Sequence, residues 1–529
     1  MTVFRAVVFL AACRLTLIGI AAGAEPTLSH LYPVAGQQGT TVSVTASGTF
    51  GKWPPQVWVD APGITFKPSK EAGKFEVEIA KDARLGPHLV RIFNADGASI
   101  PRFFIVSDEP ELPEKEPNDD FKSPQKIASL PATINGRLDK IGDVDSFGVT
   151  LKRGQTLVAW VEAYVIASTF DGMLRVVDTK GNELAFNHDG RTLDPLLIWD
   201  APSDGELVVQ LMGFAYPATA DVKFTGGAGC VYRLHLYAGA PVRPTLPPAD
   251  PSLETVSGGH RSVDAVEAGR KPNNASLEPQ TVPIPSAVEG CFQKAGDEHR
   301  YAFTAIKQHY YQLTVATARP VSPLEAWLRI DNKAGKTLAR GESPAGSREP
   351  RLTWLAPSDG VFIAAIGDLA HHGGDDYSYR LAIWEAAPAV SGNAAVHSIL
   401  IQAGKTSELK ATVKREGGFK AKLKLAAKGL PEGVTAADVD VPEKDGEVSL
   451  KLVADPAAKP ASQPIQLMLR ETESGAEHPV RYMMTATAEE NGVPQGYSDL
   501  VIDSTDQLWL TVIPEPPKPE VPKPDATSK

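Results

Sequence analysis

Six oxygen-bearing side chains in two short segments of the chain could hold a divalent cation. They are Glu114, Glu116, Asn118, Asp119, Asp143 and Asp145. Asp143 and Asp145 are two positions apart, so on an extended strand their side chains point the same way. Calcium prefers about six to eight hard oxygen ligands, mostly carboxylates and carbonyls. The six residues therefore predict a calcium site; the alternative is an acidic connector whose side chains hydrogen-bond to nearby turns.

The same pattern occurs a second time in the chain. The segment Gly142-Asp-Val-Asp-Ser-Phe147 corresponds to Gly296-Asp-Glu-His-Arg-Tyr301, and Trp199-Asp-Ala-Pro-Ser-Asp-Gly205 corresponds to Trp354-Leu-Ala-Pro-Ser-Asp-Gly360. The spacing between corresponding residues agrees to within one position, which indicates a duplicated domain. We call the two repeats copy one and copy two.

Copy two has lost several of the acidic residues. Lys271 stands at the position of Glu116, Asn274 at that of Asp119, and His299 at that of Asp145. A lysine ammonium opposes the binding of a cation. We therefore predict calcium in copy one only.

The elements that must position these residues are short strands separated by turns. Leu157-Val-Ala-Trp-Val161 and Leu207-Val-Val-Gln-Leu211 are typical apolar strands, and Asp204-Gly205 is a typical turn pair. Such a succession, with 45 Gly and 44 Pro in 529 residues, is typical of β-sandwiches. The predicted fold class is all-β, as a multidomain string of immunoglobulin-like and jelly-roll-like sandwiches.

The two copies resemble the bacterial pre-peptidase C-terminal (PPC) domain. The resemblance rests on the opening motif E-x-E-P-N-D, the strand G-D-x-D-x-F and the strand-turn W-x-A-P-x-D-G, and it is strong only in copy one. It implies a jelly-roll-like sandwich. In PPC-like collagen-binding modules of secreted collagenases the matching acidic segment binds calcium, and the resemblance implies the same role for the six residues above.

Other parts of the chain resemble further β modules. Residues 25–107 are similar to IPT/TIG domains in their spacing of Pro, Gly and Thr, and the turn Gly429-Leu-Pro-Glu-Gly-Val434 resembles immunoglobulin-like modules of bacterial surface proteins. The predicted domains are a signal peptide (1–24), the IPT/TIG-like module (25–107), copy one (112–240), an irregular linker (241–264), copy two (265–387), an immunoglobulin-like module (389–512) and a Pro-rich tail (513–529).

The first residues have the layout of an export signal: a basic start, an apolar run and the small-residue cleavage site Ala22-Gly-Ala24. Leu10-Ala-Ala-Cys13 allows an alternative, a lipid anchor on Cys13. No later segment reaches the ~20 apolar residues of a membrane span. Cys230 and Cys291 flank the junction of the copies, and they either form a disulfide or are two buried thiols.

Charge and motifs limit the function classes. The net charge of −11 opposes nucleic-acid and anionic-membrane partners. The chain has neither G-x-S-x-G nor H-E-x-x-H, and Gly335-Lys-Thr and Gly404-Lys-Thr are predicted hairpin turns rather than phosphate loops. We expect no enzyme but an exported (periplasmic, cell-surface or secreted) binding or adhesion protein for an extracellular protein or polysaccharide. The alternatives are an accessory partner of a secreted peptidase or other hydrolase and, less favoured, a hydrolase with a site on sandwich loops.

Aromatic and histidine residues give weaker signals. Trp199 and Trp354 alternate within strands and are predicted to be core residues. Trp53 and Trp58 lie near a Pro-Pro pair and are candidates for an exposed binding patch. The pair His371-His372 resembles metal ligands, but adjacent histidines rarely bind one ion and no third histidine is near, so we predict no metal there.

Overall fold

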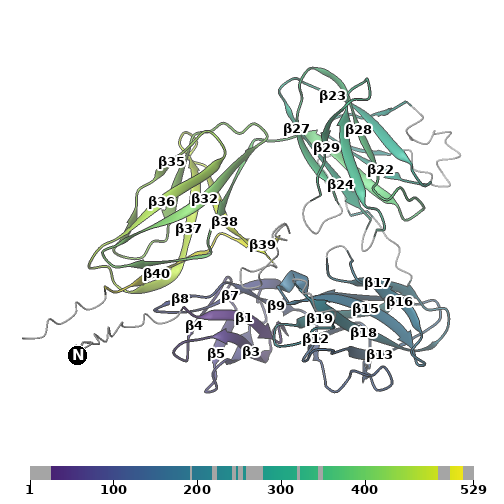
Figure 1. Cartoon of the computed structure of the whole chain (residues 1–529), viewed down its shortest axis with the longest axis horizontal. Coiled ribbons are helices and arrows are strands. Elements are labelled where there is room, and N and C mark those ends of the chain that lie inside the picture. Colours follow the sequence, from purple (N-terminus) through teal and green to yellow (C-terminus); the bar gives the residue numbers. More distant parts are fainter. Residues whose placement is uncertain are drawn as a thin grey trace, which may run out of the picture.

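A computed structural model describes most of the chain, and its strands form four β-sandwich modules (Figure 1). The fold is all-β, as expected; the only helical segment among the described residues is the short 3-10 helix η1 (Tyr164–Ile166). The predicted signal peptide and most of the predicted tail lie outside the described residues. The structure describes residues 25–190, 193–216, 223–240, 246–247, 254–257, 278–318, 322–343, 349–485 and 501–515.

The first module packs a four-stranded sheet against a five-stranded sheet. Its strands alternate inward apolar and outward polar residues, as in Lys74–Ile79, where Phe75 and Val77 are buried in the core. One sheet has the order β1 (Thr27–Tyr32), β3 (Thr41–Thr49), β6 (Lys74–Ile79), β5 (Ile64–Pro68). The other has the order β2 (Ala35–Gln37), β9 (Arg102–Ser107), β7 (Gly86–Asn94), β4 (Gln56–Val59), with β8 (Gly97–Ala98) beside β7.

The second module contains copy one in two five-stranded sheets around one apolar core. The first sheet has the order β10 (Glu111–Pro113), β12 (Ala132–Arg137), β19 (Val231–Gly239), β14 (Thr156–Glu162), β17 (Leu196–Asp200). The second has the order β11 (Gln125–Lys126), β13 (Asp145–Leu151), β18 (Gly205–Ala215), β15 (Phe170–Asp178), β16 (Glu183–Asn187).

The third module contains copy two and has the same strand order. Its first sheet runs β20 (Glu254–Ser257), β22 (Ser286–Cys291), β29 (Ser378–Glu385), β24 (Tyr310–Thr317), β27 (Arg351–Leu355). Its second sheet runs β21 (Gln280–Thr281), β23 (Glu298–Ala305), β28 (Gly360–Asp368), β25 (Ala326–Asp331), β26 (Thr337–Arg340). The repeat seen in the sequence is therefore also a repeat of topology.

Part of the predicted irregular linker is a strand. β20 lies within 241–264 and pairs in parallel with β22, just as β10 pairs with β12. The expectation of no regular structure was wrong here, because the pairing partner of β20 lies about thirty residues further along the chain and leaves no local hairpin pattern.

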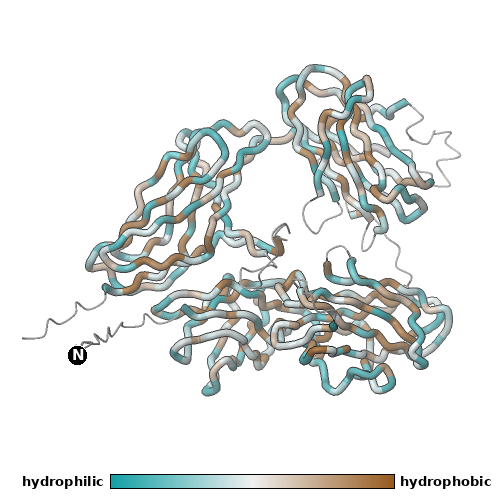
Figure 2. Tube along the Cα trace, in the orientation of Figure 1, coloured by the Kyte–Doolittle hydropathy of each residue, from teal (hydrophilic) through white to brown (hydrophobic). Residues whose placement is uncertain are grey.

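The fourth module wraps its strands around a single core. The main order is β31 (Ser398–Gln402), β40 (Leu508–Ile513), β37 (Ala461–Glu471), β38 (Glu477–Thr485), β30 (Ala389–Ala394), β32 (Thr406–Glu416), β36 (Gly446–Ala454), β34 (Val434–Ala436). Beside this path lie β33 (Leu423–Lys428), β35 (Val439–Val441) and β39 (Val501–Thr505). β40 completes the module and extends one residue into the predicted tail. Figure 2 shows apolar segments along the strands of each module.

The first and fourth modules are in contact, so the string of modules folds back on itself (Figure 1). Arg91 of β7 is fully buried and donates hydrogen bonds to His397 Nδ1 at 3.1 Å and to the carbonyl of Gln507 at 3.1 Å. Trp509 of β40 is 1% exposed and packs against Trp58 and Phe93, with ring centroids 5.9 and 4.8 Å apart.

This packing corrects the expectation for two tryptophans. Trp58 belongs to the contact between modules, and Trp53 packs between Phe50 and Phe75 and donates to the carbonyl of Ser69 at 2.8 Å. Neither forms an exposed patch, because both rings are covered by aromatic neighbours.

Trp199 and Trp354 pack on the cores of their modules, as predicted. Gly335 lies in the turn of the β25–β26 hairpin, as predicted. Gly404 does not lie in a hairpin, since β31 pairs with β40 whereas β32 pairs with β30 and β36.

The two described cysteines are free thiols, so the disulfide alternative is wrong. Cys230 is buried in the core of the second module. Cys291 is buried in the third module, where its Sγ donates to the carbonyl of Gly374 at 3.2 Å. Each sulfur is enclosed in a different sandwich. The lipid-anchor alternative concerns Cys13, which lies outside the described residues.

Candidate metal centre

The parallel pairing of β10 with β12 delivers Glu114 to the end of the second module. Directly after β10, the backbone N–H of Glu114 donates to the carbonyl of Asn135 at 2.9 Å. Its Oε2 accepts the backbone N–H of Arg137 at 2.9 Å. The side chain is therefore fixed against β12 rather than free on a connector.

Asn118 is the centre of the acidic segment. It is 1% exposed, its backbone N–H donates to Glu116 Oε2 at 3.0 Å, and its Nδ2 donates to Glu114 Oε1 at 3.3 Å. Its carbonyl accepts the N–H of Ser146 at 3.1 Å, which ties the segment to β13. Asn118 thus holds Glu114 and Glu116 on the same side of the loop.

Asp145, the first residue of β13, completes the group. It is fully buried, and its Oδ2 accepts the hydroxyl of Tyr232 at 2.5 Å. One carboxylate oxygen from each of Glu114, Glu116 and Asp145 lies within 4.8 Å of the others. The structure therefore brings together four of the six predicted ligands, namely Asn118 and the carboxylates of Glu114, Glu116 and Asp145.

Asp119 and Asp143 lie beside this group and face a lysine. Lys140 Nζ is 3.0 Å from Asp119 Oδ2 and 3.3 Å from Asp143 Oδ1. A hydrogen bond shared with Asp143, together with Lys140, lowers the pKa of Asp119, whereas burial and the same hydrogen bond raise the pKa of Asp143. The sequence analysis missed Lys140 as a neighbour of the carboxylates.

The carboxylates of the centre are hard to ionise together. Burial raises the pKa of Glu114 to about 7, with Glu116 and Asp139 as nearby negative charges. Burial and the charge of Glu114 raise the pKa of Asp145 to about 9. In the absence of a cation, protons must neutralise part of the group at neutral pH.

The donors of the centre fit a hard cation. The buried Oδ1 atoms of Asn118 and Asp145 have no hydrogen-bond partner, although buried polar atoms are normally satisfied. Together with Glu114 and Glu116 they offer only oxygen ligands. Oxygen ligands of this kind suit calcium or magnesium rather than zinc, which prefers nitrogen and sulfur. The residues present are therefore chemically suited to calcium.

Copy two fills the corresponding space with aromatic rings. His299, in the place of Asp145, hydrogen-bonds through Nδ1 to the hydroxyl of Tyr379 at 2.6 Å, and Tyr379 corresponds to Tyr232. Phe292 packs on His299 with ring centroids 4.8 Å apart. The positions of Lys271 and Asn274 lie outside the described residues. In the described part of copy two, the imidazole of His299 thus replaces the carboxylate of Asp145, and its Nδ1 already has a hydrogen-bond partner in Tyr379.

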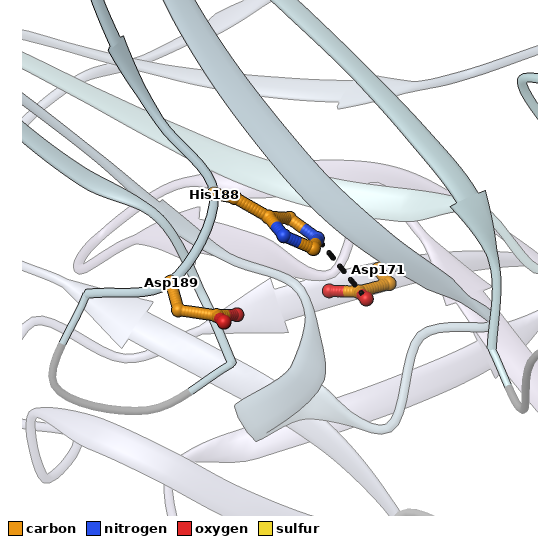
Figure 3. Close-up of side chains that lie close together, drawn as sticks. All are labelled: Asp171, His188 and Asp189. Atoms are coloured by element: carbon orange, nitrogen blue, oxygen red, sulfur yellow. Dashed lines mark ion pairs between the residues drawn. The ribbon is translucent and has the colours of Figure 1, made fainter.

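A second group of possible ligands escaped the sequence analysis. Asp171 of β15 and the residues His188 and Asp189 after β16 come together through the β15–β16 hairpin, with His188 Nε2 3.2 Å from Asp171 Oδ2 (Figure 3). Their separation in sequence gives no local motif. The His188 and Asp171 side chains are 39% and 24% exposed, so the ion pair explains the arrangement without a metal. His371 and His372 belong to neither group.

No protein-family model matches the chain, and no curated protein matches it. Similar solved structures include the pre-peptidase C-terminal domain of collagenase from Bacillus anthracis, at 11% identity, 22% coverage of this chain and 98% of that chain, and a TM-score of 0.17. The fibronectin(III)-like modules of Clostridium thermocellum CbhA are similar at 8% identity, with 46% of this chain and 92% of that chain covered and a TM-score of 0.14. The S-layer protein rSbsC is similar at 10% identity, with 86% of this chain and 54% of that chain covered and a TM-score of 0.15. TM-scores this low assign neither family nor function.

Proposed function

We propose that this chain is an exported, non-catalytic binding protein whose second module is ordered by one calcium ion. The observation that supports it most directly is the convergence of Glu114, Glu116 and Asp145 around Asn118, with two buried oxygens left without a hydrogen-bond partner. A bound calcium ion would supply the positive charge that buried carboxylates otherwise lack. The layout of the N-terminus supports export.

The centre is placed where it can stiffen the joint between the first two modules. Glu114 accepts the backbone N–H of Arg137, and the guanidinium of Arg137 lies 4.8 Å from the ring centroid of Tyr32 in the first module. On the other side, Gln37 Nε2 donates to the carbonyl of Asp108 at 3.1 Å, at the start of the acidic connector. Fixing Glu114 would therefore support Arg137 where it faces Tyr32, while the hydrogen bond of Gln37 holds the other end of the connector.

Among the described residues, no helical segment has the length and apolarity required to cross a bilayer. A rigid scaffold with several sandwich faces suits the binding of an extracellular polymer or of a secreted hydrolase.

Calcium titration by calorimetry on the full-length protein tests the proposal. The diagnostic variant is Asp145→His, which installs the residue that copy two carries, and the matched control is Asp297→Asn, at the copy-two position equivalent to Asp143. We expect one site in the wild type and in the control, no site in Asp145→His, and a higher melting temperature in calcium than in chelator. Equal titration of wild type and Asp145→His would refute calcium binding at this centre, as would no heat in the wild type.

A further inference from the structure

A cleft of about 900 Å³ lies where the first, second and fourth modules meet, and we call it the junction cleft. One wall is the outer face of the β12–β19–β14 sheet, the opposite wall comes from β7 and β9, and β39 contributes to the rim. A buried apolar cluster beside it joins all three modules through Phe103, Ile166 and Met484. The volume is within the range of about 300–1,000 Å³ typical of ligand sites.

The wall from the second module carries Trp160, His235 and Glu162, which contact one another in a row. Trp160 and His235 are directly opposite on β14 and β19, and their rings stack with centroids 4.5 Å apart. His235 Nε2 lies 3.2 Å from Glu162 Oε2, and Arg233 forms ion pairs with Glu162 and Glu111. Burial alone would raise the pKa of Glu162, but His235 and Arg233 lower it, so Glu162 is a carboxylate at neutral pH.

Copy two shows that the sandwich does not need this group. The strand pairing places Thr314 opposite Ala382 where copy one has Trp160 opposite His235, and Ala316 stands where copy one has Glu162. Only the arginine is retained, as Arg380. The Trp160, Glu162 and His235 side chains therefore belong to this cleft rather than to the fold of the module.

The carboxylates around the junction cleft indicate a cationic ligand. Carboxylates of Asp108, Glu109 and Asp503 are exposed at the rim, and Glu162 lies inside. Among the described lining residues Arg233 is the one Lys or Arg, and two glutamates already pair with it. The remaining lining is largely apolar, from Leu85, Phe103, Ile105 and Ile502 among others.

We propose that the junction cleft binds a segment of a protein partner that carries lysine or arginine next to apolar residues. The cation would lie between the rim carboxylates and Trp160, where ion pairing and a cation–π contact act together. A neutral polysaccharide fits less well, because the carboxylates of the rim would gain no cationic partner from it. The inference rests on the proposed function, since it names the partner of a binding protein, but it uses none of the predicted calcium ligands.

Calorimetry on the full-length protein tests this with three probes: a blocked hexapeptide of alternating lysine and leucine, its counterpart with glutamate in place of lysine, and cellohexaose. The variants Trp160→Thr and Glu162→Ala each install the copy-two residue, so the fold is expected to survive. Thr314→Ala, at the copy-two position equivalent to Trp160, is the matched control.

We expect the lysine hexapeptide to bind wild type and control equally, and Trp160→Thr and Glu162→Ala each to bind it about tenfold more weakly. Raising NaCl from about 50 to about 300 mM should weaken binding, because it shortens the screening length. The glutamate hexapeptide should give no heat. No binding of the lysine hexapeptide, unchanged affinity in Trp160→Thr, or binding of cellohexaose in its place would overturn the proposal. Asp145→His separates the two proposals, because it removes a predicted calcium ligand and changes no residue that lines the junction cleft.

Discussion

Acidification should loosen the contact between the first and fourth modules, and His397 is the group that responds. The guanidinium of Arg91 can only donate, so His397 Nδ1 must accept its hydrogen bond and the ring must be neutral. Burial, and then the charges of Arg91 and Arg102, lower the pKa of His397 to about 3 from the ordinary value of 6.5. Protonation would remove the acceptor and place a second cation beside buried Arg91.

The sign and size follow from proton linkage. Separating the modules exposes His397, which then binds a proton more readily, so the stability of the contact is complete above about pH 6.5 and falls as the pH decreases toward 3. Each pH unit in this window is worth about 1.4 kcal/mol. At pH 5 the loss is about 2 kcal/mol, which solvent access to the partly exposed ring reduces toward about 1 kcal/mol.

Small-angle scattering and thermal melting between pH 8 and pH 4.5 would detect the loss, with His397→Gln as the test variant. Glutamine keeps an acceptor for Arg91 but does not titrate. His30, whose pKa is lowered to about 4 by burial and by Arg102, titrates in the same window, so the relevant quantity is the difference between wild type and His397→Gln. An identical pH dependence of the two proteins, or an NMR titration of His397 near its ordinary pKa in the intact protein, would refute the reasoning.

Four further outcomes are expected. Trp509→Ala should destabilise the fourth module by about 3–5 kcal/mol and increase the radius of gyration, because a buried ring at the contact is lost; unchanged scattering would contradict this. Gly136→Ala should lower the melting temperature in proportion to about 1–3 kcal/mol, since an added Cβ overlaps the ring of Tyr232. Asn118→Ala should weaken calcium binding about tenfold in calorimetry, because it removes one buried oxygen and the support of Glu114, and unchanged affinity would contradict this. Cys230 and Cys291 should resist a thiol reagent until the protein is denatured, and slow reaction of only one of them in native buffer would show that its module opens locally.

The sequence predicted the features that repeat or alternate locally. Strand alternation predicted the sandwiches, and the shared spacing of Asp143 and Asp297, and of Trp199 and Trp354, predicted the repeat. The acidic motif correctly selected Glu114, Glu116 and Asp145 as residues that come together. These predictions succeeded because strand period and short motifs are local properties of the chain.

The sequence could not predict contacts between distant strands. The hydroxyl of Tyr232 reaches Asp145 from a strand far along the same module, and Lys140 meets Asp119 across a loop. Arg91 and His397 belong to different modules, and no periodicity links them. The wrong expectation for Trp58 has the same origin, because its cover, Trp509, comes from the last strand of the structure.

The contact between Arg91, His397 and Trp509 also determines how the molecule carries a mechanical load. Glu25, at the start of the first module, hydrogen-bonds through Oε1 to the hydroxyl of Ser398, and β40 ends at Ile513 in the same fourth module. A tension applied between Glu25 and Ile513 therefore acts first on this contact. The second module shares in this load, because Ile166 lies in one buried apolar cluster with Met484 of the fourth module, whereas the third module lies outside the direct path between the two ends. Once these contacts separate, the distance between Glu25 and Ile513 can increase while each sandwich stays folded.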